Sequence, residues 1–350
     1  MRILSILVWV FLLGCGAARA ADALPATVYF PVLPFDAGDN ALPQMIPLAA
    51  NHPLDGVQAG LTRAIIVIHD DTRDANGALS MMTSLAGQSN GSTMIIAPQF
   101  LLASDIARYA DHLPDEGSAF AAWQMNGWMS GDDSVGSAGH KGVSSFTIVD
   151  LLLMYLSDRT VFPDLRVIVI AGSGAGANFV QRYAAFGIAA DLVEQQNIAL
   201  RYVLADASSY LYMTPNRPMA GKQGFGSVDA AACPGFNSYP YGTDGLNSYA
   251  RRIGANAAKT NYAVHFVTYL NVPVADAVPE SNCASLLQGA DSAMRAVNYD
   301  LYLQAIYSDV AAKTQKFSLV KNVRNDAVGL FGSACGMAAL FGDGTCKDSP

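Results

Sequence analysis

The stretch that most constrains the fold runs from Val167 to Ala184 and has the pattern of a strand, a tight turn and a helix. Its first part, Val167-Ile-Val-Ile-Ala171, is a continuous apolar run, as expected for a strand buried on both faces of a parallel sheet. Glycines alternate with small residues from Gly172 to Gly176, and apolar residues then recur at helical spacing between Phe179 and Tyr183. We therefore expect a sharp turn at the carboxyl end of a central strand.

Three kinds of turn have a similar pattern, and the first of them does not fit. A dinucleotide-binding loop needs Gly-x-Gly-x-x-Gly, and the spacing fails at the third glycine. The nucleophile elbow of α/β-hydrolases is Gly-x-Ser-x-Gly, and Gly172-Ser-Gly-Ala-Gly176 fits it except that Gly174 stands at the nucleophile. The turn can also be a glycine turn kept for close helix packing, without any chemistry.

The amino-terminal segment has the pattern of an export signal. Met1-Arg2 precedes the apolar run Ile3 to Leu13, and Ala18-Arg-Ala20 is a small-residue cleavage pattern. The run is too short for a membrane span. We expect residues 1–20 to be removed and the protein to be secreted or periplasmic. A lipoprotein site at Cys15 fits less well, because Leu13 suits that pattern poorly.

Removal of residues 1–20 would leave four cysteines, and an even count in an exported chain indicates two disulfides. Of the three possible pairings we favour Cys335–Cys346, a short loop, which leaves Cys233–Cys283. The chain has 29 acidic against 21 basic residues and no Lys/Arg cluster, which argues against nucleic acid or anionic lipid as a partner. No later stretch is long and apolar enough to predict a transmembrane helix.

The rest of the chain alternates predicted strands with predicted helices. This pattern predicts an α/β fold with a doubly wound, mostly parallel sheet, in one domain over residues 21–350 with a loop-rich insertion near 206–260. The expected strands are Arg63–His69, Thr93–Ala97, Arg166–Ala171, Arg201–Ala205, Tyr262–Leu270 and Lys316–Val320, and further helices are expected over Ser144–Leu156, Ala290–Ala312 and Ala327–Phe341.

Serine-hydrolase chemistry on this architecture needs a histidine after the acid, in the order Ser, Asp, His. The last histidine is His265, so the final 85 residues hold no base. Ser173 is the nearest hydroxyl to the missing nucleophile, although an elbow exposes one residue only. His69 with Asp70 and Asp71 could suggest a metal, but no second cluster has ligand spacing, and we expect neither metal nor cofactor.

From about Arg63 to Phe341 the chain resembles a little-characterised family of exported bacterial and fungal α/β-hydrolases, usually labelled esterase-like. The resemblance implies an α/β-hydrolase fold. It rests on motifs spread over the chain: Ile66-Val-Ile-His69 with Arg73-Asp-Ala75, Ala97-Pro-Gln-Phe100, Trp123 with Gly127-Trp128, Phe179-Val-Gln-Arg-Tyr-Ala184, Ser208-Ser-Tyr-Leu-Tyr212, Cys233-Pro234 and Phe331-Gly-Ser-Ala-Cys335.

The departures from that family fall on its catalytic residues. Gly174 stands at the nucleophile, Asn325 at the base, and Asp70 where a glycine beside the oxyanion hole is expected; the acid position, near Asp276, is retained. We expect Asp70, Gly174 and Asn325 to border one cleft together with His69, Trp128 and Tyr210, although these aromatic side chains can equally pack the loops down.

The expected function is a binding or structural relative of esterases, for which an ester-like or apolar small molecule is a possible ligand. The alternative is an active hydrolase using a rearranged residue such as Ser173.

Overall fold

The computed structural model describes residues 28–34, 36–38, 41–108, 120–136, 139–219, 224–274 and 282–346. The predicted signal segment, Cys15 and Asp276 lie outside these ranges. The strands are β1 (Val28–Val32), β2 (Gln44–Ala50), β3 (Arg63–Ile68), β4 (Thr93–Pro98), β5 (Leu101–Leu102), β6 (Ala122–Trp123), β7 (Val167–Ser173), β8 (Ala199–Ala205), β9 (Arg217–Pro218), β10 (Phe225–Gly226), β11 (Phe266–Asn271) and β12 (Gln315–Leu319).

Eight of these strands form one sheet in the order β1-β2-β4-β3-β7-β8-β11-β12. The pairings from β4 through β3, β7, β8 and β11 to β12 are all parallel, whereas β1 with β2 and β2 with β4 are antiparallel. The predicted doubly wound, mostly parallel sheet is therefore confirmed. β7 lies at its centre, as its continuous apolar run requires.

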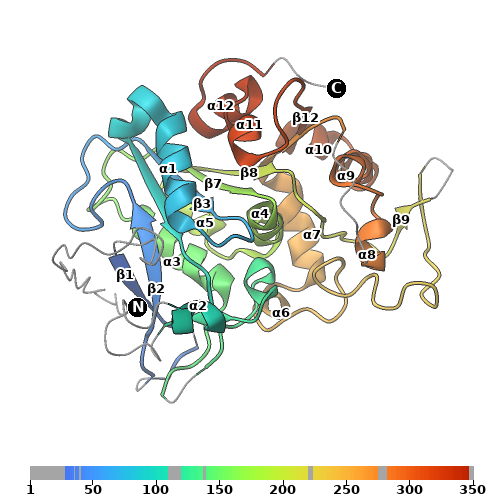
Figure 1. Ribbon diagram of the computed structural model, residues 1–350, viewed down its shortest axis with the longest axis horizontal. Helices are drawn as coiled ribbons and strands as arrows, with labels where there is room; N and C mark the ends of the chain where they lie inside the picture. The colour runs from blue at the N-terminus through green and yellow to red at the C-terminus, as the bar shows by residue number, and fades with distance from the viewer. Residues whose placement is uncertain are drawn as a thin grey trace.

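Helices cover both faces of the sheet (Figure 1). Alternate residues of β7 explain why: Ile168 and Ile170 belong to the buried cluster on one face of the sheet, and Val169 and Ala171 belong to the cluster on the other face. No helix among the described residues is long and apolar enough to cross a membrane. The helices are α1 (Ala75–Ala86), α2 (Ala103–Arg108), α3 (Ser145–Leu156), α4 (Ala175–Phe186), α5 (Ala190–Gln195), α6 (Ala250–Ile253), α7 (Ala255–Val264), α8 (Cys283–Leu286), α9 (Ser292–Tyr307), α10 (Asp309–Thr314), α11 (Ala327–Phe331) and α12 (Ala334–Phe341).

Some predicted boundaries were wrong. The strand expected from Tyr262 begins only at Phe266, because residues 262–264 end helix α7 and bury Tyr262 against the core. The helix expected over 290–312 is broken at Ser308, where φ is +46°, and the terminal helix is interrupted before Ser333, which caps α12. Strands β1 and β2 had no clear sequence signal.

A buried carboxyl group links three helical segments beneath the sheet. Asp150 of α3 is fully buried and accepts hydrogen bonds from the hydroxyls of Tyr183 and Tyr249 and from the backbone N–H of Ile188. Burial nevertheless raises the pKa of Asp150 to about 6, because removal from water disfavours the charged form more than these donors favour it.

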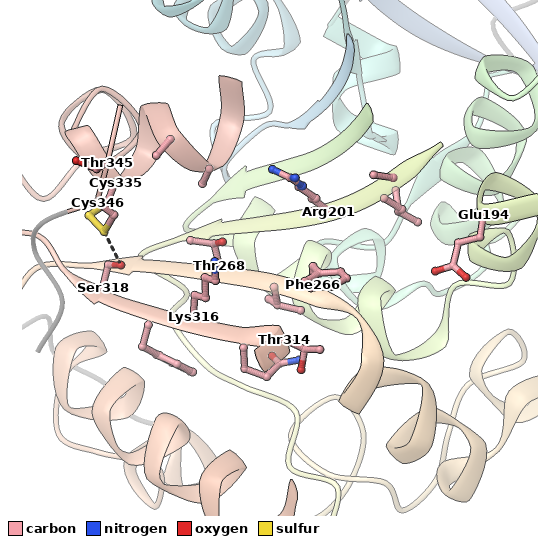
Figure 2. A pocket seen from close by; sticks show the side chains of 17 residues that line it. Glu194, Arg201, Phe266, Thr268, Thr314, Lys316, Ser318, Cys335, Thr345 and Cys346 are labelled. Carbon is pink, nitrogen blue, oxygen red and sulfur yellow. Dashed lines mark hydrogen bonds between the residues drawn. A yellow bond between two sulfur atoms is a disulfide. The ribbon is translucent and has the colours of Figure 1, made fainter. Parts of the chain in front are cut away.

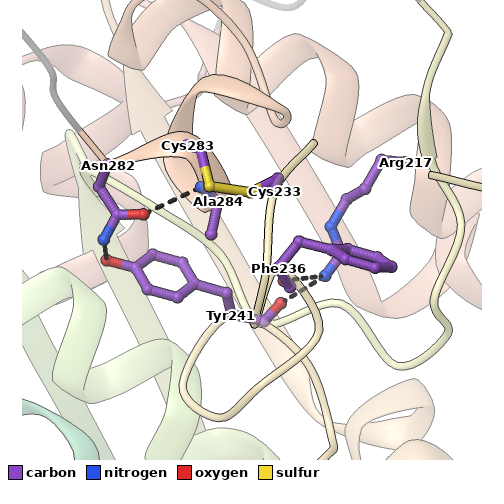
Figure 3. The surroundings of a disulfide bond; sticks show 7 residues. All are labelled: Arg217, Cys233, Phe236, Tyr241, Asn282, Cys283 and Ala284. Carbon is purple, nitrogen blue, oxygen red and sulfur yellow. Dashed lines mark hydrogen bonds between the residues drawn. A yellow bond between two sulfur atoms is a disulfide. The ribbon is translucent and has the colours of Figure 1, made fainter. Parts of the chain in front are cut away.

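Both favoured disulfides, Cys335–Cys346 and Cys233–Cys283, are present. The second joins the loop-rich segment to the start of α8 (Figure 3). In that segment the buried guanidinium of Arg217 donates to the carbonyls of Phe236 and Tyr241, each at 3.0 Å. A buried cation and a covalent bond thus hold a region that has little regular secondary structure.

Candidate functional site

The turn after β7 has the geometry of a strand-to-helix elbow. Gly174 has φ +52° and ψ −115°, follows the last residue of β7 and is the N-cap residue of α4. Its N–H donates to Ala205 O on the neighbouring strand at 2.9 Å. Gly176 packs against the end of β3 so closely that a Cβ there would stand 2.4 Å from Ile68 O. The glycines of this stretch therefore allow a sharp turn at residue 174 and a close contact between α4 and the end of β3.

The carboxylate of Asp70 fills the space that a side chain at residue 174 would need. A Cβ built on Gly174 would stand 2.5 Å from Asp70 Oδ1. The same oxygen accepts hydrogen bonds from Ala175 N at 2.9 Å and from Asp71 N at 2.7 Å. Burial raises the pKa of Asp70, and the nearby carboxylates of Asp71 and Asp206 act in the same direction.

These two donors have a specific meaning on this topology. In α/β-hydrolases the oxyanion hole consists of the N–H after the nucleophile and an N–H from the loop that follows the third strand. Here Ala175 directly follows Gly174, and Asp71 lies in the loop after β3. The sequence indicated only that Asp70 stands where a glycine is expected; in the structure, its carboxylate accepts hydrogen bonds from both of these N–H groups.

Asp70, Gly174 and Asn325 border one cavity of about 720 Å³ at the carboxyl edge of the sheet. Asn325 lies in the exposed loop between β12 and α11. Asp206, directly after β8, borders the same cavity, and its backbone has a φ of +50°, which is uncommon for a residue other than glycine. Its buried Oδ1 has no hydrogen-bond partner within the described ranges.

One face of α4 lines this cavity, although no motif in the sequence had marked it as part of the site. Asn178 and Arg182 follow Gly174 at four-residue intervals, so all three lie on one side of the helix. Asn178 Nδ2 donates to Ser208 Oγ at 2.7 Å, and Arg182 Nη2 donates to Ser209 Oγ at 3.0 Å. The four-residue spacing was the one available sequence signal for these residues.

The three ring-bearing residues expected to border the cleft are buried beneath it instead. His69, Trp128 and Tyr210 are each at most 2% exposed. Trp128 stacks on Phe100 with a centroid separation of 5.5 Å, and Tyr210 stacks on Tyr299 at 4.4 Å. These rings hold the loops against the core, because an aromatic ring buries more apolar area against another ring than at the wall of a polar cleft.

His69 has no free nitrogen with which to act as a base. Its Nδ1 donates to Asp70 O at 2.8 Å, and its Nε2 accepts from Phe100 N at 3.0 Å. Burial lowers its pKa to about 4, so the ring is neutral at ordinary pH. The histidine next to the elbow is therefore part of the scaffold.

Ser173 is half-buried at the last position of β7 and does not line the cavity. The pairing of Ile68 with Gly172 puts His69 beside Ser173, but both ring nitrogens of that histidine are already bonded. His69 is therefore not available to take the proton of Ser173. Asp276, the expected acid, lies outside the described ranges.

The disulfide region forms part of the rim of this cavity. Tyr241 lines the cavity, and its hydroxyl accepts a hydrogen bond from Asn282 Nδ2 at 2.9 Å (Figure 3). Asn282 precedes Cys283 and caps α8 through Ala284 N at 2.9 Å. The rim is therefore tied covalently and by hydrogen bonds to the loop that carries Cys233.

No protein-family model matches the sequence, and no curated protein is similar to it in sequence. Solved structures do match. LpqC, a poly(3-hydroxybutyrate) depolymerase from Bordetella parapertussis, shares 16% identity over 88% of this chain and 92% of that chain, with a TM-score of 0.54. Poly(aspartic acid) hydrolase-1 from Sphingomonas sp. KT-1 shares 17% identity over 87% of this chain and 96% of that chain, also with a TM-score of 0.54. Together with the sheet topology, these likenesses show that the chain has the α/β-hydrolase fold.

Proposed function

We propose that this protein binds a polar ligand in the cleft between Gly174 and Asn325 and does not hydrolyse it. The observation that carries the proposal is the hydrogen bonding of Asp70 Oδ1 to Ala175 N and Asp71 N. Hydrolases need these donors free, because they stabilise the charge that develops on the substrate oxygen. Here an internal carboxylate uses them.

The remaining parts of the catalytic apparatus support the same proposal. Residue 174 has no side chain, and Asn325 supplies an amide where a base would be needed. An amide cannot take a proton at neutral pH, so it offers hydrogen bonds only. Recruitment of Ser173 has no support in the geometry, since the serine does not line the cavity and His69 is fully bonded.

The walls of the cleft favour a polar ligand over an apolar one. Asn178, Arg182 and Ser209 contribute amide, guanidinium and hydroxyl groups to the lining, and Asp206 contributes a carboxyl group. A cavity of about 720 Å³ is in the size range of small-molecule sites. The two disulfides fit a periplasmic or extracellular location, in agreement with the proposed removal of residues 1–20.

The test has a chemical arm and a binding arm. The wild type and Ser173→Ala are assayed with p-nitrophenyl acetate and a serine-directed fluorophosphonate, and we expect neither turnover nor labelling. Calorimetry with soluble trimers of 3-hydroxybutyrate and of aspartate, chosen from the substrates named for the two structural neighbours, then probes the cleft. We expect binding of one trimer without cleavage, weakened by Asn178→Ala.

Two results would contradict the proposal. Hydrolysis above the buffer rate that disappears in Ser173→Ala would show a rearranged enzyme. Binding that is absent, or equal in the wild type and Asn178→Ala, would show that the cleft is not a site for such ligands.

A further inference from the structure

A second cavity, of about 830 Å³, lies apart from the cleft, over strands β8, β11 and β12 (Figure 2). Its floor is formed by the first residues of β8, β11 and β12, whereas the cleft lies at the carboxyl ends of the strands. Helix α12 and the Cys335–Cys346 disulfide form one wall. The two cavities are therefore separate sites, and a role for this second cavity does not depend on the function proposed for the cleft.

Strand register places a phenylalanine and two cations on the same face of this floor. Arg201 pairs with Phe266, and Thr268 pairs with Lys316, so the four side chains project to the same side of the sheet. Figure 2 shows all four directed into the cavity. Arg201 and Lys316 are exposed, and Phe266 is 56% exposed.

Both cations are without a partner in the part of the chain that the structure describes. There, Arg201 and Lys316 form no ion pair and no side-chain hydrogen bond. The lining contains one acid, Glu194, which lies at the far end of the cavity from the disulfide (Figure 2). These two cations outnumber the one acid in the lining and give the cavity a local positive potential, although the whole chain has a net charge of −8.

The rest of the lining is small and apolar or carries hydroxyl groups. Ala338 and Ala339 of α12 line the cavity together with Phe266, and Thr268 and Ser318 contribute hydroxyls. Apolar walls with a few convergent polar groups are the usual composition of a small-molecule site, and an arginine provides a two-pronged donor for a carboxylate.

We propose that this cavity binds an amphipathic anion, that is, a carboxylate or similar oxyanion carried on an apolar body. The anionic group contacts Arg201 and Lys316, and the apolar body packs on Phe266 and the alanines of α12. A neutral ligand of the same shape gains only the apolar contacts, and a cationic ligand meets like charges.

The test uses 1-naphthoate as the probe and 1-naphthamide as its neutral counterpart, both titrated into the full-length protein by calorimetry at low ionic strength. We expect 1-naphthoate to bind roughly three- to ten-fold more tightly than the amide, as for a half-exposed charge pair. Arg201→Gln and Lys316→Gln should each remove most of that preference, and Phe266→Ala should weaken both ligands.

Lys321→Gln is the matched control, because Lys321 is an exposed lysine that follows β12 and lies outside the cavity. It should leave both affinities unchanged, and so should Asn325→Ala in the cleft. All of these residues are exposed, and unchanged melting temperatures would confirm folding. Equal affinity for the two ligands, no binding of 1-naphthoate, or an equal loss in Lys321→Gln would each overturn the proposal.

Discussion

Replacement of Gly174 by serine should destabilise the protein in two ways, by straining the backbone and by displacing the carboxylate of Asp70. A Cβ at residue 174 would stand 2.5 Å from Asp70 Oδ1, so the carboxylate must leave both of its N–H donors. Backbone strain at positive φ costs about 1–3 kcal/mol, and loss of the charge-assisted hydrogen bonds costs roughly 2 kcal/mol more. We expect a decrease of about 3–5 kcal/mol in the free energy of unfolding.

The chain supplies a matched control for the backbone contribution. Gly87 has φ +51° and ψ −120°, almost the conformation of Gly174, and no atom lies within 4 Å of the position that a Cβ would take there. Ser308 shows that a serine is tolerated at φ +46° and ψ −124°. Gly87→Ser should therefore cost only the strain, about 1–3 kcal/mol.

The assay is urea denaturation of the wild type, Gly174→Ser, Asp70→Gly and the double variant. In the Asp70→Gly background the cost of Gly174→Ser should fall to that of Gly87→Ser, which gives a coupling of about 2 kcal/mol between the two sites. Additive effects, or a cost of Gly174→Ser equal to that of Gly87→Ser in the wild-type background, would refute the idea that Asp70 fills this space.

Two further predictions concern activity and pH. Because nucleophile and base act as a unit, worth on the order of 10⁶-fold in turnover, p-nitrophenyl acetate hydrolysis should arise only when Gly174→Ser and Asn325→His are combined with Asp70→Gly; turnover by either single variant would contradict this. The pKa of Asp150, about 6, lies above its ordinary value of 3.8, so the folded protein holds this proton more tightly than the unfolded chain does. The stability that the protonated Asp150 contributes is therefore fully present below about pH 4 and is lost as the pH rises through 6. The stability of the wild type relative to Asp150→Asn should therefore fall by about 3 kcal/mol between pH 4 and pH 7, and a flat or rising difference would contradict it.

The central part of the fold was predictable because its sequence signals are local and agree with one another. The apolar run of β7, the turn at Gly174 and the helical spacing of α4 all point to the same structure. The boundary at Tyr262 was not predictable in this way, since an apolar residue at a helix end and one at a strand start are both buried. The contacts of helix α7 with the core determine that residue 262 belongs to the helix.

For the candidate site, the sequence predicted residues that border the cleft but not the hydrogen bonds of Asp70. Chain order and residue identity suffice to predict that Gly174 and Asn325 border one cleft, and both line the same cavity. That Asp70 Oδ1 bonds to Ala175 N depends on the direction in which a loop side chain turns across a 105-residue separation. A sequence pattern does not indicate which way a loop side chain points, so the hydrogen bonds of Asp70 could be found only in the structure.

The Cys233–Cys283 bond has a consequence for how the cleft can bind. It closes a loop of 50 residues, and Asn282, next to it, holds the hydroxyl of Tyr241 at the rim. A rim fixed before the ligand arrives has little conformational entropy left to lose, so more of the contact energy remains as affinity. If the Cys233–Cys283 bond were reduced, these loops would regain conformational freedom, and ligand binding would have to restrict it again.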